Sequence, residues 1–300
     1  ADTLLMPPPP LSPAMQPLPE SNPGSSESAP EGGAEGVPAL RLVGSVARGA
    51  GRWVDRSDRF EVAGLHVHLL GVGGSGMSGL ARLLRARGAE VSGSDSSPGE
   101  ATEALEREGI AVSADQGRAW LPEVCDLVVA SAAIKEDHPQ LEEARRRGAP
   151  VLLYAEALGR CMLGRTGVAI AGTHGKSTTT AMLGCALTDA GLDPGVIVGA
   201  NVAQLELGSL GTAVGPRRGT GFRLGAEKIA SGNMAGRPGV LVAEACEYNR
   251  SFHNYRPLLA SISSVEADHL DCYGTLDEVV RSFREFAALL PSAERGGRLL

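Results

Sequence analysis

The sequence predicts an α/β fold: an N-terminal Rossmann-like domain with a parallel sheet, followed by a second α/β domain built around a phosphate loop (P-loop). From about residue 61, short apolar runs alternate with segments whose apolar residues recur at helical spacing. Two glycine-rich loops each lie between an apolar run and a helical segment. The chain also holds 40 glycines and only 4% aromatic residues, a balance that suits tight turns between strands and helices.

Residues 1–60 are predicted to form a disordered tail. About half of the 19 prolines lie within residues 7–38, together with Ser, Gly and Glu and with few apolar residues. Such a composition buries too little apolar surface to form a core. The alternative is that this tail is a proline-rich ligand for a partner domain.

Residues 61–160 are predicted to form the Rossmann-like domain. Apolar runs and helical segments alternate along it, which indicates a parallel sheet with helices on both faces. Strands are expected at residues 65–71, 89–95, 110–113, 126–132 and 150–154, and helices at 77–88, 100–108 and 139–147.

Residues 161–300 are predicted to form the P-loop domain, which we expect to be incomplete because the chain stops at the opening of another strand. Thr275 and Glu278 have the spacing of a capping box at the start of its last helix. Residues 208–239, with nine glycines, are predicted to be a mobile insertion. Strands are expected at residues 167–172, 195–202, 239–245 and 258–265, and helices at 176–191 and 275–290.

Charge and cysteine usage limit the classes of partner. The formal net charge of −7 does not favour non-specific electrostatic binding to nucleic acid or anionic lipid. No stretch approaches the ~20 apolar residues of a membrane helix, and residues 1–30 lack a secretory signal pattern, so we expect a cytoplasmic protein. The five cysteines are widely spaced and form no CxxC pair, which favours reduced thiols.

The first glycine-rich loop has the pattern of a dinucleotide-binding fingerprint. Gly71, Gly73 and Gly76 form G-x-G-x-x-G, and Asp95 follows the last glycine by 19 residues at the end of the next predicted strand. Bare backbone lets a diphosphate approach the helix N-terminus, and the acid is placed to meet a ribose hydroxyl. The pattern predicts a nucleotide diphosphate site without specifying NAD. The alternative is that the glycines serve only close packing of strand and helix.

The second loop, GTHGKST at residues 172–178, predicts a triphosphate site between a strand and a helix. Its glycines let successive N–H groups surround phosphate oxygens, Lys176 can reach the β- and γ-phosphates, and the Ser177 hydroxyl can join the coordination of Mg²⁺. The loop departs from the usual pattern because Ile170 occupies the place of the first glycine. The alternative is a chance match in a surface loop.

A third polar cluster follows two apolar, strand-like runs. Because the carboxyl ends of parallel strands meet at one crevice, we expect its side chains to converge near the P-loop, where carboxylates would hold Mg²⁺. Taken singly, each acid is as well explained as a solvated loop residue, and the histidine as a structural one. The residues are Glu244, Glu247, Glu266, Asp268, His269 and Asp271.

These motifs, in this order and spacing, resemble those of the Mur ligases. The resemblance runs from about residue 62 to residue 291 and is greatest for members that join L-alanine to UDP-N-acetylmuramate. Family members have three domains; this chain is expected to contain the first and most of the second and to lack the third. The matching segments are GVGGSGMSGLA, SGSD, AGTHGKSTTTAM, EACEYNRSF and VEADHLDCYG.

Carried over residue by residue, the resemblance implies two nucleotide sites and two metal positions. The UDP-sugar would be bound by Gly71, Gly73, Gly74, Ser75, Gly76 and Met77, with Asp95 at the uridine end. ATP would be bound by Gly172, Thr173, His174, Gly175, Lys176, Ser177 and Thr178. The resemblance also implies one Mg²⁺ at Ser177 and Glu244 and a second metal at His269, and it makes Lys176, Glu244 and His269 the catalytic residues.

The implied reaction is an ATP-dependent ligation in peptidoglycan precursor synthesis. ATP would phosphorylate the carboxylate of UDP-N-acetylmuramate, and L-alanine would displace phosphate from the acyl phosphate. The alternatives are a sister ligase that adds a preformed peptide, an NAD-dependent oxidoreductase that leaves the second loop unused, and a truncated non-catalytic nucleotide-binding module. Without the closing third domain, the 300-residue form is expected to ligate little.

Several positions depart from the family pattern. Cys246 stands where an Asp is frequent, Ser264 where an Asn is usual, and Tyr154 where an Arg is common. Ala114 or Asp115 takes the place of a His in the sugar domain. These departures affect the expected details of the sugar site and the catalytic rate. They leave the P-loop lysine, Glu244 and His269 in place.

Overall fold

The computed structural model describes residues 55–56, 59–206 and 220–300. The predicted tail therefore lies outside the described residues except at its end, where β1 (Asp55–Arg56) pairs antiparallel with β2 (Arg59–Phe60). Phe60 is 5% exposed and belongs to the core of the first domain. An ordered strand pair thus precedes residue 61, because an aromatic ring there packs against the domain.

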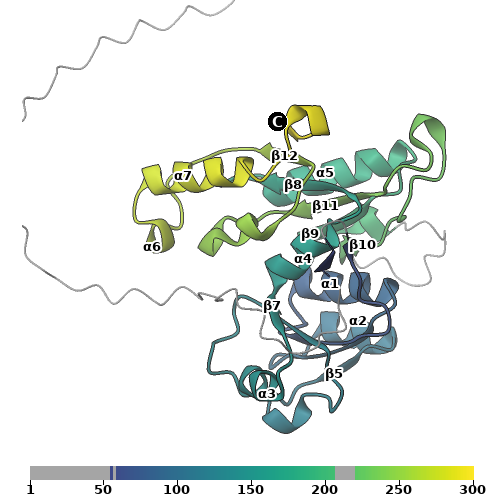
Figure 1. Ribbon diagram of the computed structural model, residues 1–300, viewed down its shortest axis with the longest axis vertical. Coiled ribbons are helices and arrows are strands. Elements are labelled where there is room, and N and C mark those ends of the chain that lie inside the picture. The colour runs from purple at the N-terminus through teal and green to yellow at the C-terminus, as the bar shows by residue number, and fades with distance from the viewer. Residues whose placement is uncertain (1–54, 57–58, 207–219) are drawn as a thin grey trace, which may run out of the picture. The chain divides into compact units, whose positions relative to one another are not determined.

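The first sheet is fully parallel and has the strand order β5-β4-β3-β6-β7 (Figure 1). Leu69 packs with Leu80 of a helix on one face, whereas its neighbour Leu70 packs with Leu141 of a helix on the other. This alternation confirms a sheet covered on both faces. Its elements are β3 (His66–Leu70), α1 (Ser75–Ala86), β4 (Glu90–Ser94), α2 (Glu100–Arg107), β5 (Ala111–Ser113), η1 (Arg118–Trp120), β6 (Leu127–Ala130), α3 (Pro139–Arg147) and β7 (Val151–Leu153).

The second sheet has the order β10-β9-β11-β8-β12-β13 and is parallel except for the antiparallel pair of β10 and β9. The predicted α/β class is confirmed for both sheets. The last helix, α7, starts as expected, with the Thr275 hydroxyl accepting the Glu278 N–H. The elements are β8 (Thr166–Ala171), α5 (Lys176–Asp189), β9 (Gly195–Val202), η2 (Ala203–Glu206), β10 (Thr220–Arg223), η3 (Gly232–Met234), β11 (Val240–Glu244), η4 (Tyr248–Asn254), β12 (Leu259–Ile262), α6 (Leu270–Tyr273), α7 (Leu276–Ala287), η5 (Ala293–Arg295) and β13 (Arg298–Leu299).

Residues 220–239 differ from the predicted mobile insertion. They begin with a sheet strand, β10, and Arg223 is buried beside Asp193, with 2.6 Å between guanidinium and carboxylate. The side chain of Ile229 is also buried. This half of the segment is built into the domain because it supplies both apolar and paired charged side chains; residues 208–219 lie outside the described residues.

Helix α4 (Tyr154–Cys161) connects the two sheets. Its buried residues share one apolar cluster with α1 and with the strands of both sheets. Gly159 lies so close to the backbone of η4 that a Cβ there would be 2.0 Å from the Asn254 carbonyl oxygen. On α1, a Cβ on Gly79 would lie 3.3 Å from the ring of Phe222 in β10. The two sheets are therefore joined by close helix packing at two places.

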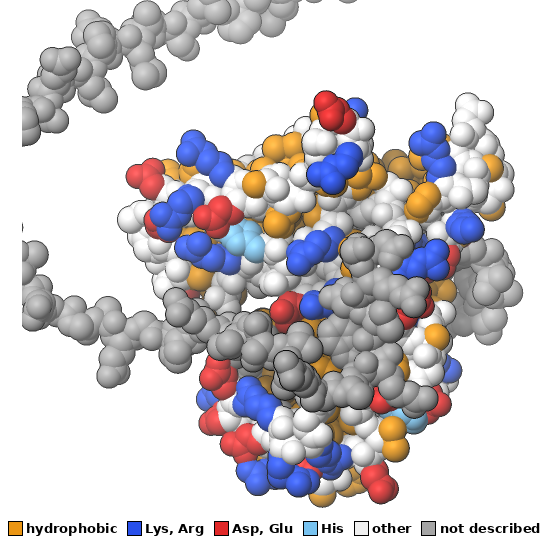
Figure 2. Space-filling model, viewed as in Figure 1, with side chains coloured by type: hydrophobic (Ala, Val, Ile, Leu, Met, Phe, Trp, Pro, Cys, Tyr) orange, Lys and Arg blue, Asp and Glu red, His pale blue; other side chains and the backbone are white. Residues whose placement is uncertain are grey.

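Within the described ranges, no helix has the length and apolarity needed to cross a lipid bilayer. On the face shown in Figure 2, acidic and basic side chains intermingle over the described residues.

Candidate functional site

The first glycine-rich loop begins where β3 ends. Gly71 has a φ of 77°, a conformation that favours glycine, and its N–H donates to the Ser94 carbonyl oxygen at 2.8 Å. Gly74 is the N-cap of α1 and provides no side-chain cap. The N–H groups of the first turn, from Ser75 to Met77, are therefore free of a capping side chain, as an anion site at a helix N-terminus requires.

Asp95 is tied to this loop in the structure. Its Oδ2 accepts the Gly73 N–H at 2.8 Å and its Oδ1 accepts the Ser97 N–H at 2.9 Å. A Cβ on Gly73 would lie 2.8 Å from Asp95 Oδ2, so only glycine lets the acid approach. The spacing of this acid from the glycines thus has a structural reason: Asp95 links the ends of β3 and β4.

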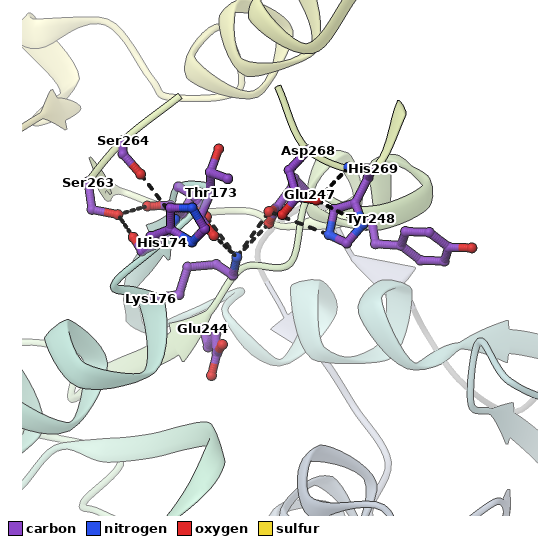
Figure 3. A network of polar contacts seen from close by, with 12 residues as sticks. Thr173, His174, Lys176, Glu244, Glu247, Tyr248, Ser263, Ser264, Asp268 and His269 are labelled. Atoms are coloured by element: carbon purple, nitrogen blue, oxygen red, sulfur yellow. Dashed lines mark hydrogen bonds and ion pairs between the residues drawn. The ribbon is translucent and has the colours of Figure 1, made fainter. Parts of the chain in front are cut away.

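The P-loop connects β8 to α5, and Lys176 lies at its centre (Figure 3). Its Nζ donates to the carbonyl oxygens of Gly172 at 2.7 Å and Thr173 at 3.1 Å, and to Glu247 Oε1 at 3.0 Å. Gly172 and Gly175 have φ values of 135° and 81°. The lysine is therefore held by three oxygen acceptors, two of them carbonyl oxygens of its own loop.

Glu244, at the end of β11, pairs with the residue after the lysine. Ser177 Oγ donates to Glu244 Oε1 at 2.9 Å, and the Gly199 N–H donates to Oε2 at 2.7 Å. The Tyr255 hydroxyl holds the Glu244 carbonyl oxygen at 2.8 Å. Burial raises the pKa of Tyr255 well above its ordinary value, so this hydroxyl stays protonated. Two oxygen ligands of the kind Mg²⁺ prefers, Ser177 Oγ and the Glu244 carboxylate, thus lie together.

His269 lies in a separate group with two carboxylates. His269 Nε2 is 3.8 Å from Glu247 Oε1, and His269 Nδ1 is 3.9 Å from Asp268 Oδ1. Potential ligand atoms of these three residues all lie within 4.8 Å of one another. Figure 3 shows the Glu244 carboxylate pointing away from this group. The structure therefore brings His269 to Glu247 and Lys176, whereas Ser177 and Glu244 form a neighbouring pair.

The segment after β12 supports the P-loop from the other side. The Ser264 carbonyl and hydroxyl oxygens accept the N–H groups of Thr173 at 2.9 Å and His174 at 3.0 Å. The Glu266 N–H donates to Thr173 Oγ1 at 2.9 Å. Ser263 Oγ also donates to the His174 carbonyl oxygen. Ser264, which departs from the family pattern, thus holds the main chain of the P-loop at Thr173 and His174.

Three further predicted residues lie on the surface of the site. Thr178 is exposed on α5, Asp271 is exposed on α6, and His174 is exposed with its Nε2 3.7 Å from Glu266 Oε2. Of the six residues in the third cluster, Glu247, Asp268 and His269 meet, while Glu244, Glu266 and Asp271 lie outside that group. Sequence spacing placed all six near one sheet edge but could not assign their partners.

The sequence named Glu247 as a candidate near the P-loop but did not pair it with Lys176, and it gave no role to Gly199. The buried Glu247, 2% exposed, is the partner of Lys176, and the Gly199 N–H fixes Glu244. A signal for Glu247 existed: it follows a strand end by three residues, as the first acid after Glu244. No signal identified Gly199, because its contribution is a main-chain N–H.

Fold and site together define a class: an α/β protein with two glycine-rich loops, each connecting the carboxyl end of a parallel strand to a helix. Two family models match the chain in tandem, "Mur ligase family, catalytic domain" over residues 66–166 and "Mur ligase middle domain" over residues 170–296. A solved structure of UDP-N-acetylmuramate:L-alanyl-gamma-D-glutamyl-meso-diaminopimelate ligase from Neisseria meningitides has 30% identity and a TM-score of 0.64, covering 77% of this chain and 69% of that one. The chain belongs to the Mur ligase family.

Curated relatives include proteins named UDP-N-acetylmuramate–L-alanine ligase. The protein from Paenarthrobacter aurescens is 43% identical over 77% of this chain and 46% of its own length, and that from Kineococcus radiotolerans is 42% identical over 78% and 44%. The chain thus spans about half the length of the curated relatives it matches. A solved structure of UDP-N-acetylmuramate-alanine ligase from Thermotoga maritima has 25% identity and a TM-score of 0.63, covering 75% of this chain and 47% of that one.

Proposed function

We propose that this chain carries the two nucleotide sites of an ATP-dependent ligase that joins the carboxylate of UDP-N-acetylmuramate to the amine of L-alanine. The observation that carries the proposal is the pair of phosphate loops, with Lys176 and the Ser177–Glu244 pair at the second. The identity of 42–43% to proteins named as alanine ligases supports this substrate pair.

We assign the UDP-sugar to the first domain, residues 61–160. Its diphosphate would bind at the first turn of α1, where the N-cap Gly74 leaves the N–H groups of Ser75, Gly76 and Met77 without a side-chain cap. Gly71 and Gly73 shape the loop, and Asp95 would serve the uridine end. Because Asp95 already accepts the Gly73 N–H, its contact with uridine would be made from this fixed position.

We assign ATP to the second domain, residues 161–300. The main-chain N–H groups from Gly172 to Thr178 would surround the phosphates. Lys176 would exchange its contacts with Glu247 and two carbonyl oxygens for the β- and γ-phosphates. The lysine thus brings a positive charge to the place where a carboxylate and a triphosphate, both anionic, must meet.

Mg²⁺ fits the residues present. Ser177 Oγ and Glu244 supply oxygen ligands, and Glu247, Asp268 and His269 offer a second group of ligand atoms. Bound there, Mg²⁺ would neutralise charge on the transferring phosphate. In this proposal His269 is a metal ligand together with Glu247 and Asp268, and it does not share a metal with Ser177.

Two chemical steps follow. The carboxylate oxygen of the sugar attacks the γ-phosphorus and ADP leaves, giving an acyl phosphate. The amine then attacks the acyl carbon, phosphate leaves, and a proton is lost as the amide forms. The chain's own contribution is to position the two anions and offset their repulsion, with Lys176, Glu244 and His269 in the catalytic roles. Because the reaction consumes ATP, we propose a cytoplasmic location.

Calorimetric titration of the 300-residue chain tests the proposal directly. We expect separate, saturable binding of UDP-N-acetylmuramate and of ATP with Mg²⁺, and no preference for NADH. Tight NADH binding without UDP-sugar binding would instead support an oxidoreductase. Phosphate release by a version of the chain extended past Leu300, with L-alanine compared with a preformed tripeptide, separates the alanine ligase from the sister ligase represented by the Neisseria structure. Binding of both nucleotides without any phosphate release would identify a non-catalytic module.

A further inference from the structure

Tyr154 lies at the meeting point of the two domains. It is the first residue of α4 and follows β7 directly, at the carboxyl edge of the first sheet. Its ring packs against the apolar cluster shared by both sheets. The loop that would bind the UDP-sugar begins at the same edge, after β3.

The Tyr154 hydroxyl lies against Gly76, in the first turn of α1. A Cβ on Gly76 would be 2.6 Å from Tyr154 Oη and 2.8 Å from Cζ. A Cβ on Gly74, by contrast, would meet nothing closer than 3.6 Å. The third glycine of the fingerprint is therefore required by the tyrosine, and it lets a side-chain O–H approach the helix turn that offers N–H groups to an anion.

The hydroxyl is also a free donor. Within the described part of the chain, no hydrogen bond joins this hydroxyl to another residue. Only its burial and the charges of neighbouring groups affect its pKa. Burial, and then the Glu244 carboxylate, raise the pKa of Tyr154, so the group stays protonated.

We propose that Tyr154 is a ligand-binding residue of the first site, whose hydroxyl donates a hydrogen bond to an oxygen of the UDP-sugar diphosphate. The proposal rests on the assignment of the UDP-sugar to the first loop. Tyr154 adds a neutral, directional donor to the N–H groups of α1. A hydrogen bond to a charged acceptor is stronger than one between neutral groups, so its loss is measurable.

The test compares Tyr154→Phe with wild type by calorimetry on the whole 300-residue chain, using UDP-N-acetylmuramate, UDP, UMP, and ATP with Mg²⁺. The variant keeps the ring and its packing and removes only the hydroxyl. We expect about tenfold weaker binding of UDP-N-acetylmuramate and UDP, a loss of about 1.4 kcal/mol. UMP, which lacks the second phosphate, is expected to lose less than UDP, and ATP binding should not change.

Tyr273→Phe is the matched control. The Tyr273 hydroxyl is also held inside the protein, where it donates to the Glu247 carbonyl oxygen, but it does not contact α1. It should leave UDP affinity unchanged, and thermal melting of both variants reports their folding. Equal affinity of Tyr154→Phe and wild type for UDP would overturn the proposal, as would an equal loss for UDP, UMP and ATP. If wild type binds no UDP-sugar, the assignment of the first site itself fails.

Discussion

Lys176 and Glu247 form a buried ion pair at the centre of the P-loop. Nζ lies 3.0 Å from Oε1 and 2.9 Å from Oε2, and the side chains are 15% and 2% exposed. Each charge compensates the other where little water can reach. Under the proposed function, ATP binding separates this pair and leaves Glu247 beside Asp268 and His269.

Lys176→Met should lower both ATP affinity and stability. The loss of phosphate contacts is expected to remove acyl-phosphate formation, at a cost of several kcal/mol in the transition state. Removing one partner of a buried ion pair typically costs about 3–5 kcal/mol of unfolding free energy. Trapping of the acyl phosphate measures the first effect, and urea unfolding the second.

Glu247→Gln in the Lys176→Met background separates these effects. It removes the uncompensated charge, so most of the lost stability should return while ATP binding stays absent. If the double variant is no more stable than Lys176→Met, the ion pair does not contribute as described. Wild-type-like acyl-phosphate formation by Lys176→Met would exclude the catalytic role of the lysine.

Glu244→Gln should weaken the Mg²⁺ dependence of ATP binding. The amide keeps a carbonyl oxygen for Ser177 but loses the negative charge, so we expect about tenfold or greater loss of Mg²⁺ affinity in the presence of ATP. Titration of Mg²⁺ at fixed ATP measures it. Glu266→Gln, at an exposed carboxylate beside His174, is the control. Equal Mg²⁺ curves for Glu244→Gln and wild type would place the metal elsewhere.

Gly74 and Gly76 in the first loop should differ in how well they tolerate substitution by alanine. Gly76→Ala places a methyl 2.6 Å from Tyr154 Oη, whereas Gly74→Ala has no neighbour within 3.6 Å. We expect Gly76→Ala to cost about 1–3 kcal/mol of stability through overpacking and Gly74→Ala to leave folding almost unchanged. Chemical denaturation of the two variants decides this, and equal stabilities would contradict it.

His68 should make stability depend on pH. It is 2% exposed, its Nδ1 lies 2.8 Å from Ser92 Oγ, and burial lowers its pKa to about 4. Between this value and the unfolded value of about 6.5, the unfolded chain binds more protons. The contribution to stability is therefore complete above pH 6.5 and falls by about 3 kcal/mol as the pH drops to 4.

His68→Gln should flatten this part of the pH profile, whatever its effect on stability at pH 7. The same substitution at a less buried histidine, His66→Gln, whose side chain is 39% exposed beside Glu90, is the comparison variant. Unfolding free energies at pH 4.5, 5.5, 6.5 and 7.5 give the comparison. A wild-type slope in His68→Gln would assign the pH dependence to other groups.

The parallel sheets could be predicted from sequence because each strand and helix carries a local signal. The apolar run 66–70 and the helical spacing of Leu80, Leu83 and Leu84 are examples, and all three leucines are buried. Helix α4 and strand β10 were not predicted. Their residues are buried by contacts with segments far along the chain, such as Gly159 with Asn254 and Phe222 with Gly79, which no local pattern records.

The candidate site shows the same division. The motifs predicted the two loops and the sheet edge, because the glycines and the lysine that such loops require lie close together in the sequence. Which acid pairs with which partner depends on side-chain direction: Glu244 meets Ser177, whereas Glu247 meets Lys176. Only two residues lie between these acids in the sequence, and the turn after β11 directs their side chains to different partners.

The packing of Phe222 on Gly79 has a consequence for labelling and engineering. The helix that begins with the first phosphate loop rests on β10, a strand that starts directly after residues 207–219. A tag, cleavage sequence or fluorophore inserted next to that strand could therefore displace β10 and, through Phe222, disturb the packing of α1 in the other domain.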